Sequence, residues 1–506
     1  MRDTITSFVE RNMKRAIALF ALFLGCIGLF AQESTVERLE RELAEARAEN
    51  AALRGQVPYR YETPERAPGQ ENVLGLRVAP IRNVRAAFIG CGARGGLFLR
   101  ILSNFPDRVT IKAAADLYQE KLDAIDRELK EKGYPYEVFY TTDPDGWRKI
   151  CERDDIDMVF IATPPNLHLP IAVWAMEHGK HVAVEVPVVH NVQEAWKLVD
   201  TAERTRRHCV MLENCIYGDY ELAIKNMVDL GLFGETIHAE GGYLHNLEEY
   251  RFDYDDKTNW RTERPTRERR VSGNSYPTHG LGPIAHWLGI NRGDRMKTIV
   301  SAESADFTMR HAVNMLFGPK GDIPEGHFRP DQNLSIITTE MGRTMMLYYS
   351  TVLRQPYSRS YRLNGTRGFA EDHSQHNQSA KTCQRRLAFE PDFHSDLPAS
   401  KVNALLRRYR HPIYERFAAE AERFGGHGGM DAVMIMRLVY CLNNGLPMDI
   451  DVYDGASWSS IAFASVKSVQ LGGMPVEIPD FTRGDWKTLH GVKYYYLDEE
   501  GEMKAY

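Results

Sequence analysis

The chain has 506 residues, of which 43% are hydrophobic, 26% charged and 10% aromatic, which is ordinary for a globular protein and enough for two folding domains. Its formal net charge is -6, from 63 basic and 69 acidic residues, which argues against a general nucleic-acid binder because such proteins need a positive field. The 7 cysteines form no C-x-x-C pair, so we expect neither a disulfide framework nor a cysteine zinc site.

An apolar run over residues 16–31 follows Lys14 and Arg15. It is short for a membrane-spanning helix but has the length of the hydrophobic region of an export signal. We therefore expect residues 1–31 to be a signal peptide cleaved before Gln32, and the mature protein to be exported, most simply to the periplasm. A retained membrane anchor is the alternative.

Residues 32–80 are expected to hold a short helix and a linker. Residues 34–55 are rich in Glu, Arg and Ala and carry a weak heptad spacing, which predicts either a coiled-coil-like helix that makes a homo-oligomer or a solvated single helix. Residues 56–80 contain Pro58, Pro64 and Pro68 and are predicted to be a linker.

Residues 81–217 alternate apolar strand-like runs with amphipathic helical stretches, which predicts parallel strands joined by helices. A G-x-G-x-x-G motif at residues 90–95 lies where a strand turns into a helix, and such glycines let the backbone approach a pyrophosphate. A tight structural turn is the alternative. Asp116 ends the next strand, where a carboxylate accepts hydrogen bonds from ribose hydroxyls and disfavours a 2′-phosphate. The predicted cofactor is NAD, and the alternative is NADP, whose 2′-phosphate Arg94 could reach.

Residues 218–506 are expected to form a second α/β domain. Strand-like patterns occur at 236–246, 333–340, 344–352 and 359–365, and helix-like stretches occur at 401–424, 430–443 and 452–471.

Tyr276 and His279 stand three residues apart at a predicted helix start, which places a phenol and an imidazole on one face. Such a pair suits proton transfer near neutral pH. A buried hydrogen-bonded pair is the alternative.

The order of the glycine motif, an Ala-Thr-Pro-Pro-Asn-Leu-His block at 162–168 and Glu-Val-Pro at 185–187 resembles the Gfo/Idh/MocA family of nicotinamide enzymes. The similarity covers residues 83–490. It implies a Rossmann dinucleotide-binding domain followed by an α/β domain with an open, mostly antiparallel sheet. Sugar dehydrogenases of that family usually carry lysine where this chain has Val186, and an aspartate where it has Ser275.

One branch of the family accounts for these departures. Blocks at 212–217, 276–283, 355–357, 426–431 and 451–454 resemble glycoside hydrolase family 109, the NAD-dependent α-N-acetylgalactosaminidase group. The resemblance implies a hydrolase that cleaves terminal α-N-acetylgalactosamine, or a related sugar, by transient oxidation at carbon 3, elimination and water addition. The alternatives are an NAD-dependent sugar or cyclitol oxidoreductase and a non-enzymatic surface role.

The site residues that these patterns and the resemblance imply fall into three groups. Those expected to take part in catalysis are Glu185, Tyr217, Tyr276, His279 and Tyr357. Those expected to bind the cofactor are Gly90, Gly92, Ala93, Arg94, Gly95, Asp116, Thr163, Pro164, Asn166, His168, Glu185 and Asn214. Those expected to bind the substrate, a small molecule or a glycan, are Trp260, Arg261, Tyr276, His279 and Tyr357. His427 and Asp431, within a glycine-rich stretch, are expected either to close over the site or to serve a helix turn.

Overall fold

The structure is a computed structural model that describes residues 35–53, 57–247, 272–317, 328–373 and 385–506. The predicted signal peptide and the predicted substrate residues Trp260 and Arg261 lie outside the described residues. Within the described ranges, no helix combines the length and the apolar character that a membrane crossing requires.

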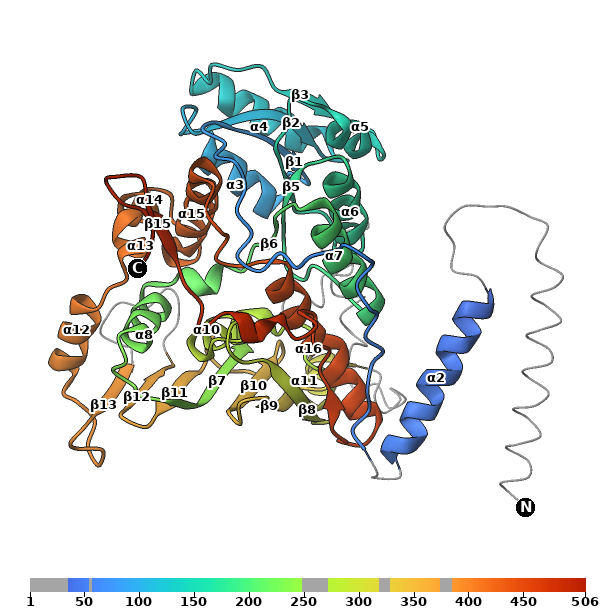
Figure 1. The fold of residues 1–506 in the computed structure, drawn as a ribbon, viewed down its shortest axis with the longest axis vertical. Coiled ribbons are helices and arrows are strands. Elements are labelled where there is room, and N and C mark those ends of the chain that lie inside the picture. The colour runs from blue at the N-terminus through green and yellow to red at the C-terminus, as the bar shows by residue number, and fades with distance from the viewer. Residues whose placement is uncertain (1–34, 54–56, 248–271, 318–327, 374–384) are drawn as a thin grey trace.

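The first half of the described chain folds around a six-stranded parallel sheet in the order β3-β2-β1-β4-β5-β6 (Figure 1). Its strands are nearly continuous apolar runs because a parallel sheet is covered on both faces. Phe88 and Phe160, for example, stack at 4.8 Å between paired strands. This strand order is that of dinucleotide-binding Rossmann folds and confirms the predicted architecture. The elements are β1 (Val84–Ile89), α3 (Ala93–Leu102), β2 (Val109–Ala115), α4 (Gln119–Glu131), β3 (Phe139–Thr141), α5 (Gly146–Glu152), β4 (Met158–Ile161), η1 (Pro165–Leu167), α6 (His168–Glu177), β5 (His181–Val184), α7 (Val192–Thr205) and β6 (Cys209–Met211).

The second half contains an eight-stranded sheet in the order β13-β12-β11-β7-β10-β9-β8-β14. Its neighbouring strands run antiparallel except for the parallel pair β7 and β10, which confirms the predicted mostly antiparallel sheet. Burial alternates along β9, with Leu334 and Ile336 exposed, because helices cover one face only. The strands are β7 (Thr236–Leu244), β8 (Met296–Glu303), β9 (Asn333–Thr339), β10 (Thr344–Ser350), β11 (Tyr361–Gly365), β12 (Gly368–Asp372), β13 (Arg385–Phe389) and β14 (Val476–Glu477).

The helices of the second half join the two sheets. Helix α10 packs on β7, α16 packs on both β8 and α7, and α15 packs on α3 of the Rossmann half (Figure 1). The single helical stretch predicted at 401–424 is divided into three helices, α12 to α14. The remaining elements are η2 (Asn214–Tyr217), α8 (Asp219–Asp229), α10 (Thr278–Leu288), α11 (Phe307–Phe317), α12 (Ala399–Arg408), α13 (Pro412–Arg416), α14 (Ala418–Phe424), η5 (His427–Gly429), α15 (Met430–Asn444), α16 (Val452–Gln470), η6 (Asp485–Thr488), β15 (Tyr495–Leu497) and β16 (Met503–Ala505).

Residues 35–53 form the predicted helix, α2 (Thr35–Leu53). It contacts helix α16 and the segment that follows α2 in the chain. Lys467 of α16 lies 3.3 Å from Glu45 and 2.7 Å from Glu49, and the hydroxyl of Tyr59 donates to Glu45 at 3.2 Å. Association of α2 with a second chain remains a prediction.

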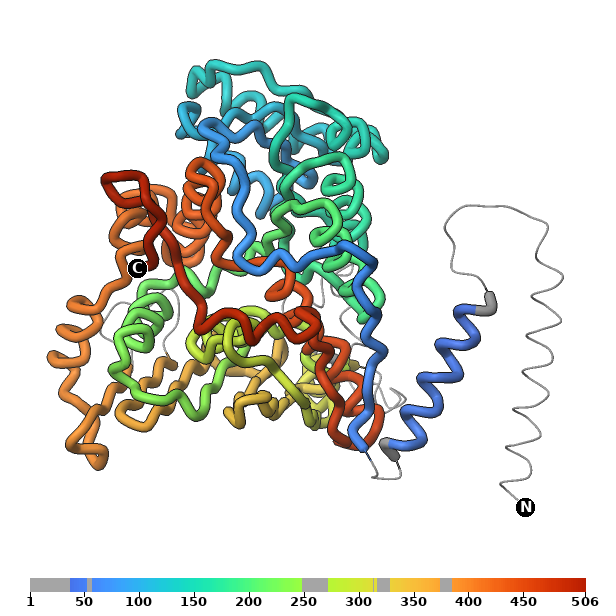
Figure 2. The backbone as a smooth tube through the Cα atoms, in the orientation of Figure 1, coloured from blue at the N-terminus to red at the C-terminus, as the bar shows by residue number. Residues whose placement is uncertain are grey.

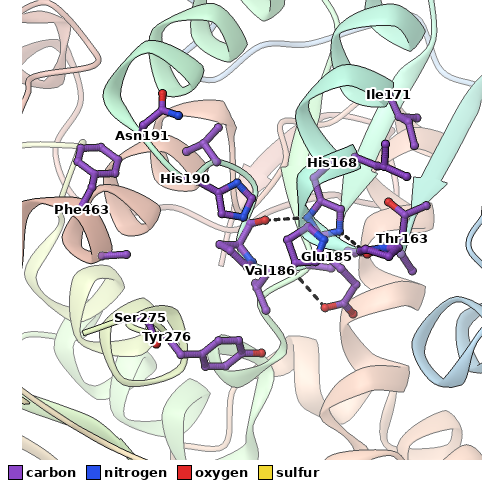
Figure 3. A pocket seen from close by; sticks show the side chains of 18 of the residues that line it. Thr163, His168, Ile171, Glu185, Val186, His190, Asn191, Ser275, Tyr276 and Phe463 are labelled. Carbon is purple, nitrogen blue, oxygen red and sulfur yellow. Dashed lines mark hydrogen bonds between the residues drawn. The ribbon is translucent and has the colours of Figure 1, made fainter. Parts of the chain in front are cut away.

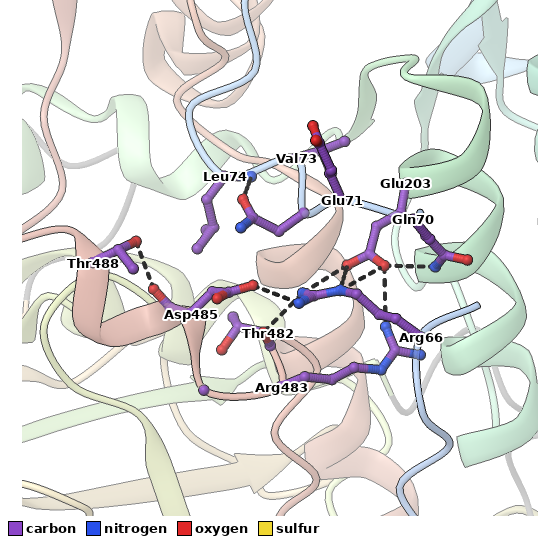
Figure 4. Close-up of polar contacts among 12 residues, drawn as sticks. Arg66, Gln70, Glu71, Val73, Leu74, Glu203, Thr482, Arg483, Asp485 and Thr488 are labelled. Atoms are coloured by element: carbon purple, nitrogen blue, oxygen red, sulfur yellow. Dashed lines mark hydrogen bonds and ion pairs between the residues drawn. The ribbon is translucent and has the colours of Figure 1, made fainter. Parts of the chain in front are cut away.

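Residues 57–83, which include most of the predicted linker, form an extended strap that packs on the rest of the chain (Figure 2). Figure 4 shows why: Arg66 of the strap and Arg483 both donate to the buried carboxylate of Glu203, which also accepts from Gln70 at 2.6 Å. A buried carboxylate needs such partners. The prolines predicted a linker, but nothing local in the sequence indicated that this segment would be packed.

Candidate functional site

A pocket of about 2750 Å³ opens at the carboxyl ends of the parallel strands and extends to the second half of the chain. This edge is where ligands of such sheets bind. Figure 3 shows its middle, where Glu185 and Val186 face Tyr276 from the opposite side, and Phe463 of α16 lies at the margin.

The glycine motif forms the floor at one end of this pocket. Gly90 has a φ of +86°, and a Cβ there would lie 2.5 Å from the carbonyl oxygen of Ala162. A Cβ on Gly95 would lie 1.9 Å from the Gly90 carbonyl oxygen, whereas one on Gly92 would meet none of the described protein atoms within 4 Å. Gly90 and Gly95 are thus required by close backbone packing, whereas Gly92 leaves an open space that we call the cradle. The cradle lies at the start of α3, where no side chain among the described residues caps the helix. This arrangement fits a pyrophosphate.

Asp116 lies at the end of β2 beside this turn. Its carboxylate accepts from the backbone N–H of Cys91 at 2.6 Å and from that of Tyr118 at 3.0 Å. These bonds fix the carboxylate at the wall of the pocket, next to Leu117 and Trp147, where an adenosine ribose would lie. The residues present therefore fit NAD.

The loop after β4 lines the middle of the pocket with Thr163, Pro164 and His168. Burial lowers the pKa of His168, although its contacts with two carbonyl oxygens act in the opposite direction. It lies 2.7 Å from the Pro187 carbonyl oxygen and 2.9 Å from that of Thr163, and it thereby joins two pocket loops (Figure 3). The Thr163 hydroxyl oxygen is buried and has no partner within the described part of the chain, so a bound group would satisfy it. Asn166 is exposed, and the described pocket lining does not include it.

Arg94, in the first turn of α3, lines the pocket, and its guanidinium group is paired with carboxylates. Its Nε donates to Glu185 at 2.8 Å, and its terminal nitrogens donate to Asp431 at 2.9 and 3.0 Å. Asn214 also lines the pocket and donates to Asp431 at 2.8 Å. Arg94 is therefore held in an ion-pair network rather than being available for a 2′-phosphate.

Tyr276 and His279 lie together at the other end of the pocket, as their spacing predicted. Their ring centroids are 4.8 Å apart and their planes are nearly perpendicular. His279 is in α10, and its Nδ1 donates to the carboxylate of Glu213, with distances of 2.7 and 2.8 Å to the two oxygens. The Nε2 atom is the ring nitrogen that remains for a substrate.

Glu213 was missed in the sequence analysis. It follows β6 and its side chain is completely buried. Burial raises the pKa of this carboxyl, but its interactions with His279, Thr278 and the backbone N–H of Cys215 together outweigh burial and leave the pKa below its ordinary value. An acid at the carboxyl end of the last parallel strand was the available signal.

A second phenol–imidazole pair, Tyr243 and His245, was also missed. The Tyr243 hydroxyl and the Nδ1 of His245 are 2.8 Å apart, and both residues line the pocket. The Tyr243 ring lies 4.9 Å from that of Tyr276. The two residues are separated by one position at the end of a strand, which places both side chains on one face.

Tyr357 lies behind this second pair. Its ring centroid is 4.9 Å from that of His245 and 5.9 Å from that of Tyr243, although Tyr357 is not among the described residues that line the pocket. Burial raises the pKa of Tyr357 well above its ordinary value, so the phenol stays protonated.

Tyr217 is placed elsewhere. It is 4% exposed, and its hydroxyl donates to Asp449 at 3.2 Å, a carboxylate already paired with Arg437. The described pocket lining does not include Tyr217. This placement corrects the predicted catalytic role, because a side chain that contacts a buried ion pair cannot at the same time face a substrate in the pocket.

Cys215 lies next to the Glu213–His279 pair. Donor atoms of Glu213, Cys215 and His279 all lie within 4.8 Å of one another, a grouping that can hold a metal ion. The His279 nitrogen in this group already donates to Glu213. The arrangement is therefore described more simply as a hydrogen-bonded acid–histidine pair.

Two family models match the chain. Residues 84–213 match an oxidoreductase family described as an NAD-binding Rossmann fold. Residues 217–488 match the C-terminal domain of glycosyl hydrolase 109.

Full-length relatives and solved structures are also similar. A glycosyl hydrolase family 109 protein of Porphyromonas gingivalis is 39% identical over 485 residues, covering 94% of this chain and 99% of that protein. An alpha-N-acetylgalactosaminidase of Bacteroides fragilis is 44% identical over 429 residues, covering 84% of this chain and 98% of that protein. A levoglucosan dehydrogenase in complex with NADH and L-sorbose is 18% identical, with a TM-score of 0.57 over 79% of this chain and 100% of that chain. The similarity to the levoglucosan dehydrogenase structure is evidence about the fold alone.

Proposed function

This chain belongs to glycosyl hydrolase family 109, is a glycosidase and uses NAD, and we propose that its substrate is a glycan ending in α-linked N-acetylgalactosamine. The resemblance and the cofactor expected from the sequence are thereby confirmed. The proposed sugar is supported by the 44% identical relative that carries the name of that activity. The oxidoreductase alternative is disfavoured, and Val186 is one reason, because valine offers no donor to a reacting hydroxyl.

The observation that carries the proposed mechanism is the Glu213–His279 pair beside Tyr276. NAD, when bound, supplies a hydride acceptor for sugar carbon 3 and returns the hydride at the end, so hydrolysis has no net redox change. His279 is positioned to take the proton of the carbon 3 hydroxyl at its Nε2. The ionised Glu213 holds the ring in the required tautomer and stabilises the imidazolium that results.

The remaining proton transfers are assigned to the pair of Tyr243 and His245, which lines the pocket and has Tyr357 packed behind it. Once carbon 3 is a ketone, the proton on carbon 2 becomes acidic, and its removal expels the glycosidic oxygen. Water then adds to the unsaturated sugar. These residues lie next to Tyr276 and His279. A sugar whose carbon 3 hydroxyl contacts His279 would therefore place its carbons 2 and 1 near them. This scheme needs no pair of carboxylic acids flanking the scissile bond.

A panel of aryl glycosides tests the proposal. Purified protein should release the aryl group from α-N-acetylgalactosaminide faster than from the other glycosides, with no accumulation of NADH. Accumulation of NADH with free monosaccharide, together with no release of aryl groups, would instead establish a dehydrogenase.

We also propose that the protein is exported and that residues 1–31 are its signal. The support is the basic pair Lys14-Arg15 followed by the apolar run. Amino-terminal sequencing of the mature protein should begin near Gln32. A mature protein that retains Met1 and sediments with membranes would favour an anchor.

A further inference from the structure

Asp431 is a buried carboxylate in the first turn of α15, and it collects hydrogen bonds from three elements. Arg94 donates to it through both terminal nitrogens, Asn214 donates at 2.8 Å, and the Nδ1 of His427 lies 2.7 Å away. Burial raises the pKa of Asp431, but the bonds from His427 and Arg94 outweigh burial and leave the pKa below its ordinary value. Asp431 is therefore an anion that links α3, η2 and η5.

The glycine-rich stretch at 425–429 is shaped around this carboxylate. Gly426 has a φ of +77°, and a Cβ there would lie 2.7 Å from an oxygen of Asp431. Gly429 has a φ of +97°, and its Cβ would lie 2.8 Å from that of Ala421. Neither position tolerates a side chain, so the glycines allow the turn to close on Asp431 and to place His427 at the pocket wall.

The network crosses the cofactor site. Arg94 is next to the cradle at Gly92, and its Nε reaches Glu185, which lies beside Val186 in the middle of the pocket. Arg94, Glu185, Asn214 and His427 all line this pocket, with Asp431 buried behind them. Arg94 and Glu185 come from the Rossmann half, whereas His427 and Asp431 come from the second half. Separating the two halves here would break a bidentate ion pair whose carboxylate is fully buried, which is costly.

We propose that Arg94, His427 and Asp431 form a clamp across the NAD site that retains the cofactor between turnovers. A dehydrogenase must exchange its oxidised and reduced cofactor, whereas an enzyme that returns the hydride in every cycle has no need to release it. The inference goes beyond the proposed substrate, because retention of NAD is measured without any sugar.

The test measures the release of cofactor from the folded holoenzyme. Protein loaded with NADH is mixed with excess NAD, and the decay of NADH fluorescence gives the dissociation rate. Asp431→Asn keeps the shape of the side chain and removes its charge. It should speed release roughly tenfold to hundredfold, the equivalent of one or two charge-assisted hydrogen bonds. The matched control is Asp294→Asn, because Asp294 is equally buried and pairs with Arg343 at 2.8 Å but does not line the pocket. This control should leave the release rate unchanged.

His427→Ala provides the deciding measurement if Asp431→Asn does not fold. The His427 side chain is 48% exposed, and its removal leaves the pair between Arg94 and Asp431 in place. Release should then be several-fold faster in a protein that still folds, with at most a modest fall in melting temperature. Folded Asp431→Asn or His427→Ala protein that releases NADH at the wild-type rate would overturn the clamp, whatever glycosides the enzyme hydrolyses.

Discussion

The Nδ1 atom of His279 lies 2.7 Å from a carboxylate oxygen of Glu213, and this bond joins the two halves of the molecule at the point where a sugar would meet the cofactor. Glu213 follows the last parallel strand of the Rossmann half, and His279 belongs to a helix of the second half. Because Glu213 is buried and ionised, it fixes which nitrogen of His279 carries the proton. The arrangement prepares Nε2 to act as a base.

Replacing Glu213 with glutamine should lower kcat by roughly 10²-fold or more, within the range that general base catalysis contributes. An amide at this position can donate to Nδ1 and so favour the wrong tautomer. The pH profile of kcat should also change, which a merely structural residue would not cause. The NAD content of the purified variant should remain that of the wild type. An unchanged kcat and pH profile would remove Glu213 from the mechanism.

Two phenylalanine substitutions separate the tyrosines in the pocket from those outside it. Tyr276→Phe removes a hydroxyl that belongs to the pocket and should reduce kcat strongly. Tyr217→Phe removes a hydrogen bond to Asp449 and should cost on the order of 1 kcal/mol of stability with little change in kcat. Activity assays and urea unfolding of both variants make the comparison. A large loss of kcat in Tyr217→Phe would restore the role that the sequence suggested.

Two alanine substitutions test the nucleotide cradle. A Cβ on Gly92 would meet none of the described protein atoms within 4 Å, and the backbone of Gly92 has a negative φ that alanine can adopt. Gly92→Ala should therefore fold normally but bind NAD more weakly. A Cβ on Gly95 would lie 1.9 Å from a backbone oxygen, so Gly95→Ala should lower the melting temperature even without cofactor. Thermal unfolding with and without NAD distinguishes the two effects. Normal NAD affinity in Gly92→Ala would mean that the cradle does not face the cofactor.

We expect the protein to lose stability in acid, in part because two histidines, His181 and His208, are buried. The Nδ1 of His181 accepts from the backbone N–H of His208, and burial lowers the pKa of each imidazole to about 3. Between pH 6.5 and about 3 the unfolded chain therefore binds more protons than the folded one, so stability falls as the pH falls. The slope is at most about 1.4 kcal/mol per pH unit for each histidine.

The variant His181→Asn keeps an acceptor that does not titrate in this range. Its urea midpoint should fall less between pH 7.5 and pH 5 than that of the wild type, whereas replacement of the exposed His178 should leave the wild-type fall intact. An identical fall in His181→Asn and wild type would refute this account of the acid sensitivity.

Local sequence patterns predicted the parts of the fold that depend on local rules. The run of apolar strands, the glycine turn and Asp116 follow from how a parallel sheet is covered and how a strand turns into a helix. The pairing of Tyr276 with His279 followed from a spacing of three residues. Each of these features is set by residues close together in the chain.

The features that the sequence did not predict depend on residues distant in the chain. Glu213 can hold His279 only because the fold places α10 beside the end of β6. The hydroxyl of Tyr217 donates to Asp449, which is 232 residues away in the chain. The strap is packed because Glu203 is buried and needs the partners that Arg66 and Arg483 provide. No periodicity in the chain encodes such pairings.

If hydrolysis proceeds through transient oxidation at carbon 3, turnover in deuterated water will label the product. Because carbon 2 is deprotonated and later reprotonated from solvent, mass spectrometry and NMR of the released sugar should show deuterium at carbon 2. Enzyme stripped of NAD should release no sugar, and adding NAD back should restore both hydrolysis and labelling. Released sugar without deuterium at carbon 2, formed equally well by enzyme that lacks NAD, would contradict the account.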